Sequence, residues 1–389
     1  MSSLIRDRAT SSPEMLQAFG DEALLRGALD FEAALAQAEA AEELIPTAHA
    51  TLVVQACGQD VDVAALAEAA AHAGTLAIPL VAELRARVAA HDPEAARSVH
   101  RGATSQDVAD TALMLQAKIG AALLVRDLDR LRDALAELAR THAATPMIGR
   151  TLLQAALPIT FGLKVANWLA SVDAASGRFN READHALALQ FGGATGSRAG
   201  LDGKGAAVAA RMAQTLGLAN PPTPWHTRRE AISGLGCALA ILTGALGKIA
   251  RDISLMAQSE VGEAFEPQVA GRGGSSAMAH KRNPTGCQVV LSAAIRAPGL
   301  AGALLSALPQ EHERGLGGWQ AEAPLLAELF QLAHGALTAL LPVVSGLEVD
   351  VAAMARNLDA ADVSGDTGEA EALVQAALTA HANARRETS

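Results

Sequence analysis

The segment that decides the fold is "ADTALMLQAKIGAALLVRDLDRLRDALAELARTHAAT", residues 109–145. It contains no proline and is rich in Ala and Leu, which are strong helix formers. Leu128, Leu131, Leu135 and Leu138 recur at steps of three and four residues, so a helix would carry them as one apolar stripe. The segment predicts a single helix far longer than the average of ~10–14 residues in globular proteins.

Four further segments have the same composition and similar length, and polar loops separate them. They are residues 159–187, 228–265, 285–308 and 322–347. Pro298 lies inside the third of these, where we expect it to kink or split the helix. Strand signals are few. The pattern predicts an all-α fold, with an elongated central bundle of five long antiparallel helices and smaller helical regions at both ends. We place the three parts at residues 1–108, 109–348 and 349–389.

The composition excludes several classes of protein. The net charge is -11, from 42 acidic and 31 basic residues, which argues against a nucleic-acid-binding protein because such proteins need a basic face. Three widely spaced cysteines without CxxC, and no HExxH, argue against a disulfide framework and a zinc site. We expect neither a metal nor a cofactor. The N-terminus has no apolar signal region and no stretch reaches about 18 uncharged apolar residues, so we expect a cytoplasmic protein that does not enter a membrane.

The loop "GRGGSSAMAHKRNPTG", residues 271–286, interrupts the helices with an unusual mixture of residues. Its glycines and the Asn283–Pro284 pair are typical of a turn that starts the next helix. That interpretation leaves six side chains without a role: Ser275, Ser276, Met278, His280, Lys281 and Arg282. The two cations and the backbone N–H groups can stabilise a serine alkoxide or hold a carboxylate. Glycines on each side give the loop freedom to move. We therefore favour a functional role.

Three more loops are rich in polar residues: "SVHRGATSQDVADTA" (98–112), "TPMIGRTLLQAALPIT" (145–160) and "PQEHERGLGGWQAE" (309–322). Their candidate substrate contacts are His100, Thr104, Ser105, Gln106, Arg150, Thr151, Gln154, His312 and Arg314. Each loop also has a purely structural interpretation. A Thr, Ser or Asp in the first can cap the following helix. The polar groups of the second can satisfy buried backbone, and the charged run of the third can simply face solvent.

Taken together, these loops resemble the aspartase/fumarase lyase superfamily, over about residues 21–359. "GGSSAMAHKRNP" is similar to its signature loop, "TSQDVADTA" to its first polar region and "GRTLLQAALPITFG" to its second. With "PWHTRRE" and "VGEAFEP", the loops are most similar to the carboxymuconate cycloisomerase branch. The sequence departs from the pattern at Ala279, where the signature usually has Pro, and at Arg101, where the branch commonly has an aromatic residue. The part after about Val351 is also shorter than in most relatives.

The resemblance implies an all-α homotetramer in which each active site combines the three polar regions from three subunits. Helices of this length span ~45 Å at ~1.5 Å per residue, so one chain can hardly bring the three regions together. The resemblance also implies a small polycarboxylate substrate and serine chemistry through an aci-carboxylate intermediate. By position, Ser275 is the acid/base residue, and Lys281 and Asn283 hold the substrate carboxylate and stabilise the intermediate.

Leu152 narrows the choice within the superfamily. Many of its lyases carry His at this position, which is tied to protonation of the departing group. An amine or alkoxide leaves poorly without a proton, because its conjugate acid has a pKa of ~10 or above, whereas a carboxylate with an acid pKa of ~4 leaves as a stable anion. Leu152 therefore fits a cycloisomerase better than an adenylosuccinate-type lyase. Nitrite is an equally weak base, so a nitrosuccinate lyase is the alternative. A structural protein without turnover fits least, because the serine, lysine and asparagine of the signature are present.

Overall fold

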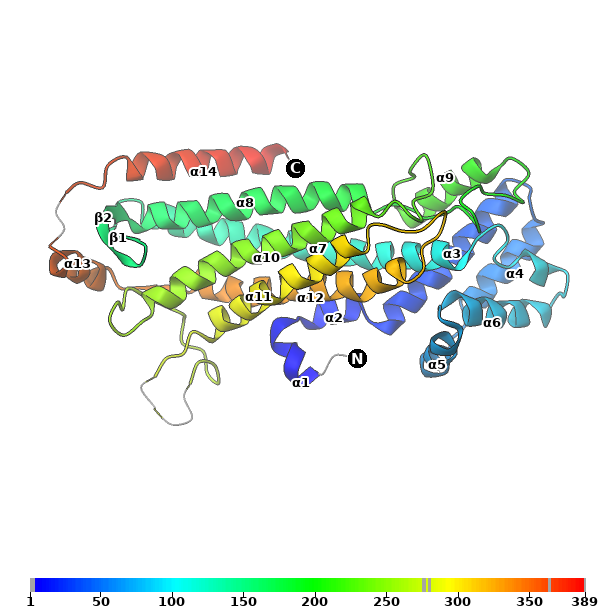
Figure 1. The fold of residues 1–389 in the computed structure, drawn as a ribbon, viewed down its shortest axis with the longest axis horizontal. Helices are drawn as coiled ribbons and strands as arrows, with labels where there is room; N and C mark the ends of the chain where they lie inside the picture. Colours follow the sequence, from blue (N-terminus) through cyan, green and yellow to red (C-terminus); the bar gives the residue numbers. More distant parts are fainter. Residues whose placement is uncertain (1–3, 275–277, 279–280, 363–364, 388–389) are drawn as a thin grey trace.

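The computed structural model describes residues 4–274, 278, 281–362 and 365–387. Five long helices lie side by side in an elongated bundle, as the sequence predicted (Figure 1). They are α7 (Ser105–Thr141), α8 (Phe161–Ala186), α10 (Glu230–Met256), α11 (Thr285–Ser306) and α12 (Gly318–Ser345). The all-α fold class is thereby confirmed. The division at residues 108 and 348 stays a prediction, although α7 already begins at Ser105.

Helix α7 is the spine of the bundle and packs against both α8 and α12. Leu128, Leu131 and Leu135 of its apolar stripe are all 0% exposed. The helix starts with a capping box, in which the Thr104 side chain accepts from the backbone and the Asp107 side chain accepts from the Thr104 backbone N–H. Such a box satisfies two of the N–H groups that a helix leaves unpaired at its start. The capping role that we considered for this loop is therefore present.

Helix α11 corrects one expectation. It continues from Thr285 to Ser306 through Pro298, so the proline does not split it. The helix packs between α10 and α12, and Val290, Ala293 and Leu304 are 0% exposed. These contacts on two sides hold the backbone in helical form although the proline removes one hydrogen bond.

Residues 145–160, expected as a polar loop, instead form an antiparallel hairpin of β1 (Pro146–Thr151) and β2 (Gln154–Thr160). Leu152 and Leu153 form its two-residue turn, with φ of 51° and 65°. A turn of this kind needs positive φ at both central residues and usually takes Asn-Gly or Asp-Gly. Since two leucines carry no such signal, the sequence did not indicate the hairpin.

Shorter helices form the N-terminal part, where α3 packs against α4 and α7. They are α1 (Leu4–Asp7), η1 (Arg8–Thr10), α2 (Pro13–Ala18), α3 (Asp21–Ala41), α4 (Thr47–Cys57), α5 (Val63–Ala73), α6 (Ala77–Ala89) and η2 (Ala95–Ser98). The remaining elements are α9 (Gly205–Leu216), β3 (Ala264–Phe265), β4 (Glu348–Val349), α13 (Val351–Ala360) and α14 (Ala370–Glu387). Strand β3 pairs with β4, and α14 returns along α8 (Figure 1).

Four helices of the described residues, α7, α10, α11 and α12, are long and apolar enough to cross a membrane by length and composition alone. These windows can include charged residues, so they differ from the uninterrupted uncharged apolar stretch of about 18 residues that the sequence lacks. In the fold, 61% of the most apolar window is buried in α7, α10 and α12, but only 28% in α11. The cytoplasmic location stays a prediction.

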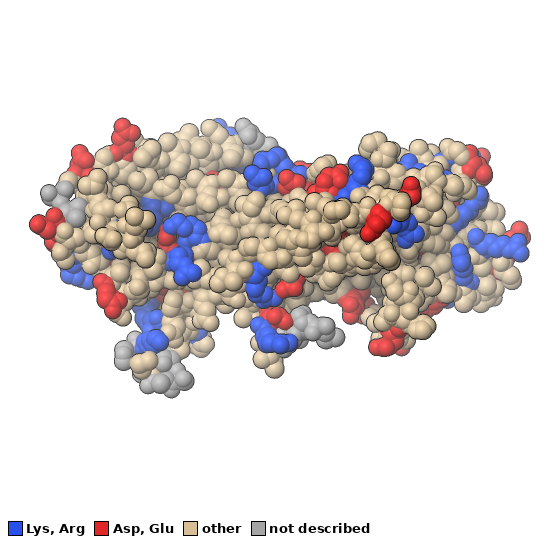
Figure 2. Space-filling view, in the orientation of Figure 1, with Lys and Arg blue, Asp and Glu red and all other residues tan. Residues whose placement is uncertain are grey.

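The flank of the bundle over α10 and α11 carries few charges, and Figure 2 shows a broad uncharged surface there. Ile241 on α10 and Ile295 and Leu305 on α11 are 48%, 75% and 48% exposed. Large apolar side chains gathered on one face mark a surface that is suited to contact with another protein chain.

Candidate active site

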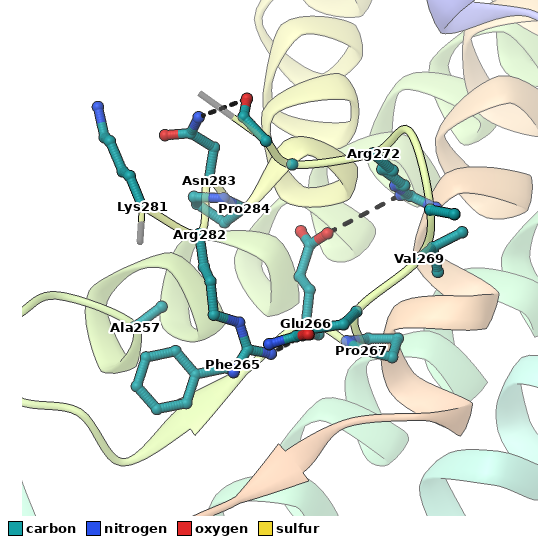
Figure 3. A pocket seen from close by; sticks show the side chains of 14 residues that line it. Ala257, Phe265, Glu266, Pro267, Val269, Arg272, Lys281, Arg282, Asn283 and Pro284 are labelled. Carbon is teal, nitrogen blue, oxygen red and sulfur yellow. Dashed lines mark hydrogen bonds and ion pairs between the residues drawn. The ribbon is translucent and has the colours of Figure 1, made fainter. Parts of the chain in front are cut away.

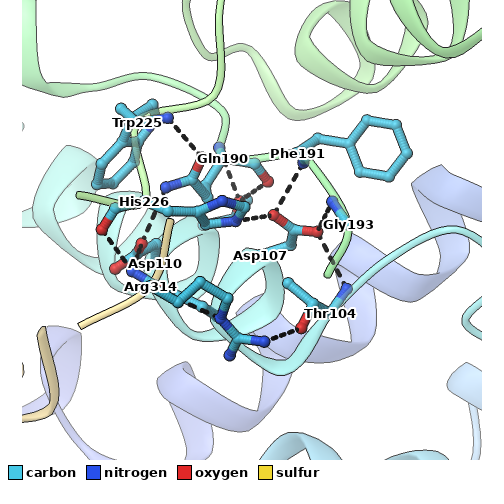
Figure 4. Close-up of polar contacts among 12 residues, drawn as sticks. Thr104, Asp107, Asp110, Gln190, Phe191, Gly193, Trp225, His226 and Arg314 are labelled. Atoms are coloured by element: carbon cyan, nitrogen blue, oxygen red, sulfur yellow. Dashed lines mark hydrogen bonds and ion pairs between the residues drawn. The ribbon is translucent and has the colours of Figure 1, made fainter. Parts of the chain in front are cut away.

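The first polar region surrounds the N-terminus of α7, where Arg314 reaches it from the segment between α11 and α12 (Figure 4). Arg314 Nη1 donates to Thr104 Oγ1 at 2.5 Å, Nη2 to Ser105 Oγ at 3.0 Å and Nε to Gln106 Oε1 at 3.4 Å. Four of the predicted substrate contacts, far apart in sequence, are thus brought together. A half-buried guanidinium beside a helix N-terminus is suited to an anion, because both attract negative charge.

Asp107 lies inside this region, with 0% of its surface exposed, and stabilises it through hydrogen bonds. Its carboxylate accepts from the backbone N–H groups of Thr104, Gly192 and Gly193 at 2.9–3.0 Å. His226 Nε2 lies 2.7 Å from Asp107 Oδ1 and completes the set (Figure 4). A buried carboxylate with four donors is fully satisfied, so it fixes the loop before α7 against the segment that follows α8.

A buried cation, Arg229 at the start of α10, pairs with Asp110, which lies about one turn after Asp107 on α7. Arg229 is 1% exposed, pairs with both Asp110 and Glu322, and stacks over the Trp225 ring. Burial raises the pKa of Glu322, although the Arg229 guanidinium opposes this shift. Gln310 Nε2 donates to Glu322 at 3.2 Å. This hydrogen bond connects the segment that carries Arg314 to α12.

The two histidines predicted as substrate contacts differ in their surroundings. His100 Nδ1 lies 2.6 Å from the buried Glu32 carboxylate. Burial lowers the pKa of His100, but the charge and the hydrogen bond of Glu32, with a smaller contribution from Asp107, together outweigh burial, so the net pKa is raised. This contact gives His100 a structural role at the start of the first polar region. His312 is exposed, with φ of 46°, in the segment before α12.

The second polar region is the tip of the β1–β2 hairpin. Thr151 and Gln154 are exposed there, and Leu152 is 92% exposed. Arg150 instead turns inward and forms a two-pronged ion pair with the buried Glu263, at 2.7 and 2.8 Å. The positive charge that we expected Arg150 to lend to a substrate is therefore balanced within the chain.

The third polar region lines a cavity of about 400 Å³ below the other end of the bundle (Figure 3). Arg272, Lys281, Arg282 and Asn283 contribute to its wall. Lys281 makes no ion pair with any residue in the described part of the chain, and its side chain points away from Glu266 in Figure 3. Its charge is therefore available to a ligand.

Two more of these side chains, those of Arg282 and Asn283, are tied to the cavity wall. Arg282 Nη2 donates to the Glu266 carbonyl oxygen at 2.7 Å and to Glu348 Oε2 at 2.9 Å. Asn283 Nδ2 donates to the Gly274 carbonyl oxygen at 3.3 Å. Met278 is 44% exposed. The predicted Ser275 and Ser276 lie outside the described residues.

Known proteins with similar sequences and structures identify the family to which this chain belongs. Residues 7–299 match a family model described as lyase. The chain belongs to this lyase family. It is 52% identical over 351 residues to a 3-carboxy-cis,cis-muconate cycloisomerase of Bradyrhizobium diazoefficiens, covering 90% of this chain and 78% of that protein. A nitrosuccinate lyase of Streptomyces davaonensis is 44% identical, covering 88% and 74%.

Solved structures give the same result for the fold of this lyase. The crystal structure of the 3-carboxy-cis,cis-muconate lactonizing enzyme from Pseudomonas putida matches with a TM-score of 0.92 and 39% identity, covering 98% of this chain and 100% of that one. A fumarate lyase structure from Mesorhizobium sp. BNC1 matches with a TM-score of 0.83 and 35% identity. Both the family and the fold implied by the sequence resemblance are confirmed.

Within one lyase chain the three polar regions remain apart (Figure 1). The N-terminus of α7 lies toward the end that carries α3 and α9, whereas the hairpin and the segment before α11 lie toward the other end. The cavity of the third region contains no residue of the first or the second. Members of this family are typically oligomeric with shared active sites, which fits this separation.

Sequence reasoning missed two acidic residues, Glu263 and Glu266, that organise the lyase's second and third regions. Glu266 accepts from the N–H groups of Gly286 and Cys287 at 3.0 and 2.7 Å and so caps α11. Arg272 lies 3.9 Å from Glu266 across the cavity (Figure 3). The signal that could have found Glu266 is its place in "VGEAFEP", an acidic segment directly before a cationic loop.

Proposed function

We propose that the protein is a 3-carboxy-cis,cis-muconate cycloisomerase, which converts 3-carboxy-cis,cis-muconate to 4-carboxymuconolactone in the catabolism of aromatic compounds through protocatechuate. The observation that carries this function is the set of four relatives of that name, 42–52% identical over 88–92% of this chain. Leu152 at the hairpin tip supports it, since the reaction needs no proton donor at that position.

The chemistry requires one new C–O bond and one new C–H bond. A carboxylate oxygen of the substrate attacks the alkene carbon, and the electron pair of the double bond moves onto a neighbouring carboxylate as an aci-carboxylate. Ser275 then gives its proton to carbon, and in the reverse direction it removes that proton. Lys281 and Asn283 are the residues that we assign to the doubly charged intermediate, because charge that develops there is best met by donors already in place.

We assign binding of the polyanionic substrate to groups from all three polar regions. They are His100, Thr104, Ser105, Gln106, Thr151, Gln154, Ser276, Met278, Arg282, His312 and Arg314. Arg150 is left out of this set, because its charge is already paired with Glu263. The assignment of Arg314 is supported by its place at the start of α7. The net charge of the chain is -11, so a local cluster of cations must overcome repulsion from the rest of the molecule.

We further propose that the enzyme is a homotetramer whose active sites combine regions from different subunits. The separation of the α7 N-terminus from the cavity before α11 supports this, as does the exposed apolar flank of α10 and α11. Light scattering of the purified protein tests the proposal. A stable and fully active monomer contradicts both the tetramer and the shared site.

A nitrosuccinate lyase is the second candidate, because a relative of that name is 44% identical. Activity on the two substrates, measured side by side, distinguishes the two functions. Lactonisation removes the conjugation of the muconate, so its ultraviolet band falls, whereas cleavage of nitrosuccinate releases nitrite. We expect the first reaction to be faster by a large factor in kcat/KM. Faster release of nitrite would reverse the assignment.

A further inference from the structure

Glu263 joins three elements at the hairpin end of the bundle. Its side chain is 0% exposed, and its two carboxylate oxygens accept from Nη1 and Nη2 of Arg150 on β1. Asn357 Nδ2 on α13 donates to Glu263 Oε1 at 2.8 Å and to the Val261 carbonyl oxygen at 2.8 Å. The backbone oxygen of Glu263 accepts from Asp350 N at 2.9 Å. One residue therefore connects the hairpin, the segment leading to the third polar region, and the C-terminal part.

The pairing of the two hairpin strands is irregular directly beside Arg150. The β1–β2 pairing passes from Ile148 to Arg150 with a shift in register at Gly149. A β-carbon at Gly149 would lie 2.7 Å from the Leu157 carbonyl oxygen, so only glycine fits. The extra residue lies on β2, where Ala156 and Leu157 face Gly149 alone, and such a bulge bends the strand and increases the local twist beside Arg150.

Beyond Arg150 the hairpin has no buried anchor. Thr151, Leu152, Leu153 and Gln154 are all exposed, and the two leucines are 92% and 82% exposed. In the described part of the chain, the ion pair with the buried Glu263 is the charged tertiary contact of β1 that lies nearest to the tip. The orientation of the tip thus depends on this pair.

We propose that Arg150 and Glu263 are positioning residues, whose ion pair holds the hairpin tip with Thr151 and Gln154 in the orientation that substrate binding requires. In this role Arg150 acts through the backbone of the hairpin and does not itself bind a substrate carboxylate. A tip misplaced by about 1 Å can cost about 100-fold in rate. The consequence for the substrate rests on the proposed function, whereas the consequence for the hairpin does not.

Three variants separate positioning from direct binding: Arg150→Met, Glu263→Gln and the two combined. If the pair positions the hairpin, each single variant raises KM about tenfold or more with a smaller change in kcat. The combined variant is then no worse than the more affected single one, because both changes break the same contact. If Arg150 instead binds substrate, Arg150→Met raises KM while Glu263→Gln leaves it unchanged or lowers it. That second pattern overturns the proposal.

Hydrogen exchange of the 146–160 peptide, followed by mass spectrometry, gives a readout that needs no turnover. We expect faster exchange in both single variants, and unchanged exchange in both overturns the proposal even if the enzyme acts on another substrate. Arg211→Met is the matched control, because Arg211 forms a more exposed pair with Glu42 in the N-terminal part. Asn357→Ala removes one hydrogen bond and leaves the ion pair, so it gives a milder test should either charge variant fail to fold.

Discussion

Glu39 on α3 is a buried acid that the fold keeps away from any partner. Its side chain is 0% exposed, and neither carboxylate oxygen has a hydrogen-bond partner among the described residues. Burial raises the pKa of Glu39 from its ordinary 4.5 to about 8, against the attraction of Arg101 and with a smaller repulsion from Glu32. Glu39→Gln removes the ionisation and keeps the size of the side chain.

The effect on stability follows from proton binding. Between pH 4.5 and 8 the folded chain keeps a proton on Glu39 that the unfolded chain releases, so the contribution of Glu39 to stability falls as pH rises. Each unit of pKa corresponds to about 1.4 kcal/mol. Relative to Glu39→Gln, the wild type is therefore destabilised by roughly 1 kcal/mol at pH 5 and on the order of 4 kcal/mol at pH 8.

Chemical unfolding of both proteins between pH 5 and pH 8, in the same state of assembly, measures this difference. The glutamine itself is buried without a partner, but that penalty does not depend on pH, so the slope with pH is the diagnostic quantity. Glu22→Gln on the same helix is the matched control, because Glu22 is exposed and its replacement should give a flat difference. A flat difference for Glu39→Gln as well would refute a neutral buried acid at this position.

Three further predictions concern turnover. Ser275→Ala should lower kcat about 100-fold or more while circular dichroism stays unchanged, and near-normal turnover would mean that another group carries the proton. Leu152→His should not raise the rate of lactonisation, because the attacking carboxylate is already an anion; a clear gain in kcat contradicts the leaving-group argument. Arg314→Met should raise KM, and the KM of the wild type should rise with ionic strength, since salt screens the attraction between the cations and the substrate. A KM that does not depend on salt counts against the cationic cluster.

Much of the fold could be predicted because its signals are local. The leucine stripe from Leu128 to Leu138 specifies α7 at helical spacing, and the capping side chains lie directly before its apolar run. The hairpin could not be predicted, since Leu152 and Leu153 adopt positive φ without glycine or asparagine. Of the two effects expected of Pro298, a split of the helix was wrong, because packing against two neighbouring helices holds α11 together.

The candidate site was predictable in its residue types but not in its connections. Arg314 and Thr104 were both recognised as candidates, yet their hydrogen bond joins positions 210 residues apart in the chain. Arg150 was expected to face a substrate, and its partner Glu263 is 113 residues away. No pattern in the sequence predicts such an ion pair, because the two residues come into contact only when the helices are packed together.

Because the α7 N-terminus and the cavity before α11 lie far apart in one chain, two different mutant chains can complement each other in one assembly. In a tetramer with shared sites, a chain with Ser275→Ala and a chain with Arg314→Met damage different parts of each site. When both alleles are expressed in one cell, some sites draw an intact serine from one chain and an intact arginine from the other. Two mutant genes that are each impaired alone should then complement one another in part, and growth on the aromatic carbon source should be better than with either mutant gene alone.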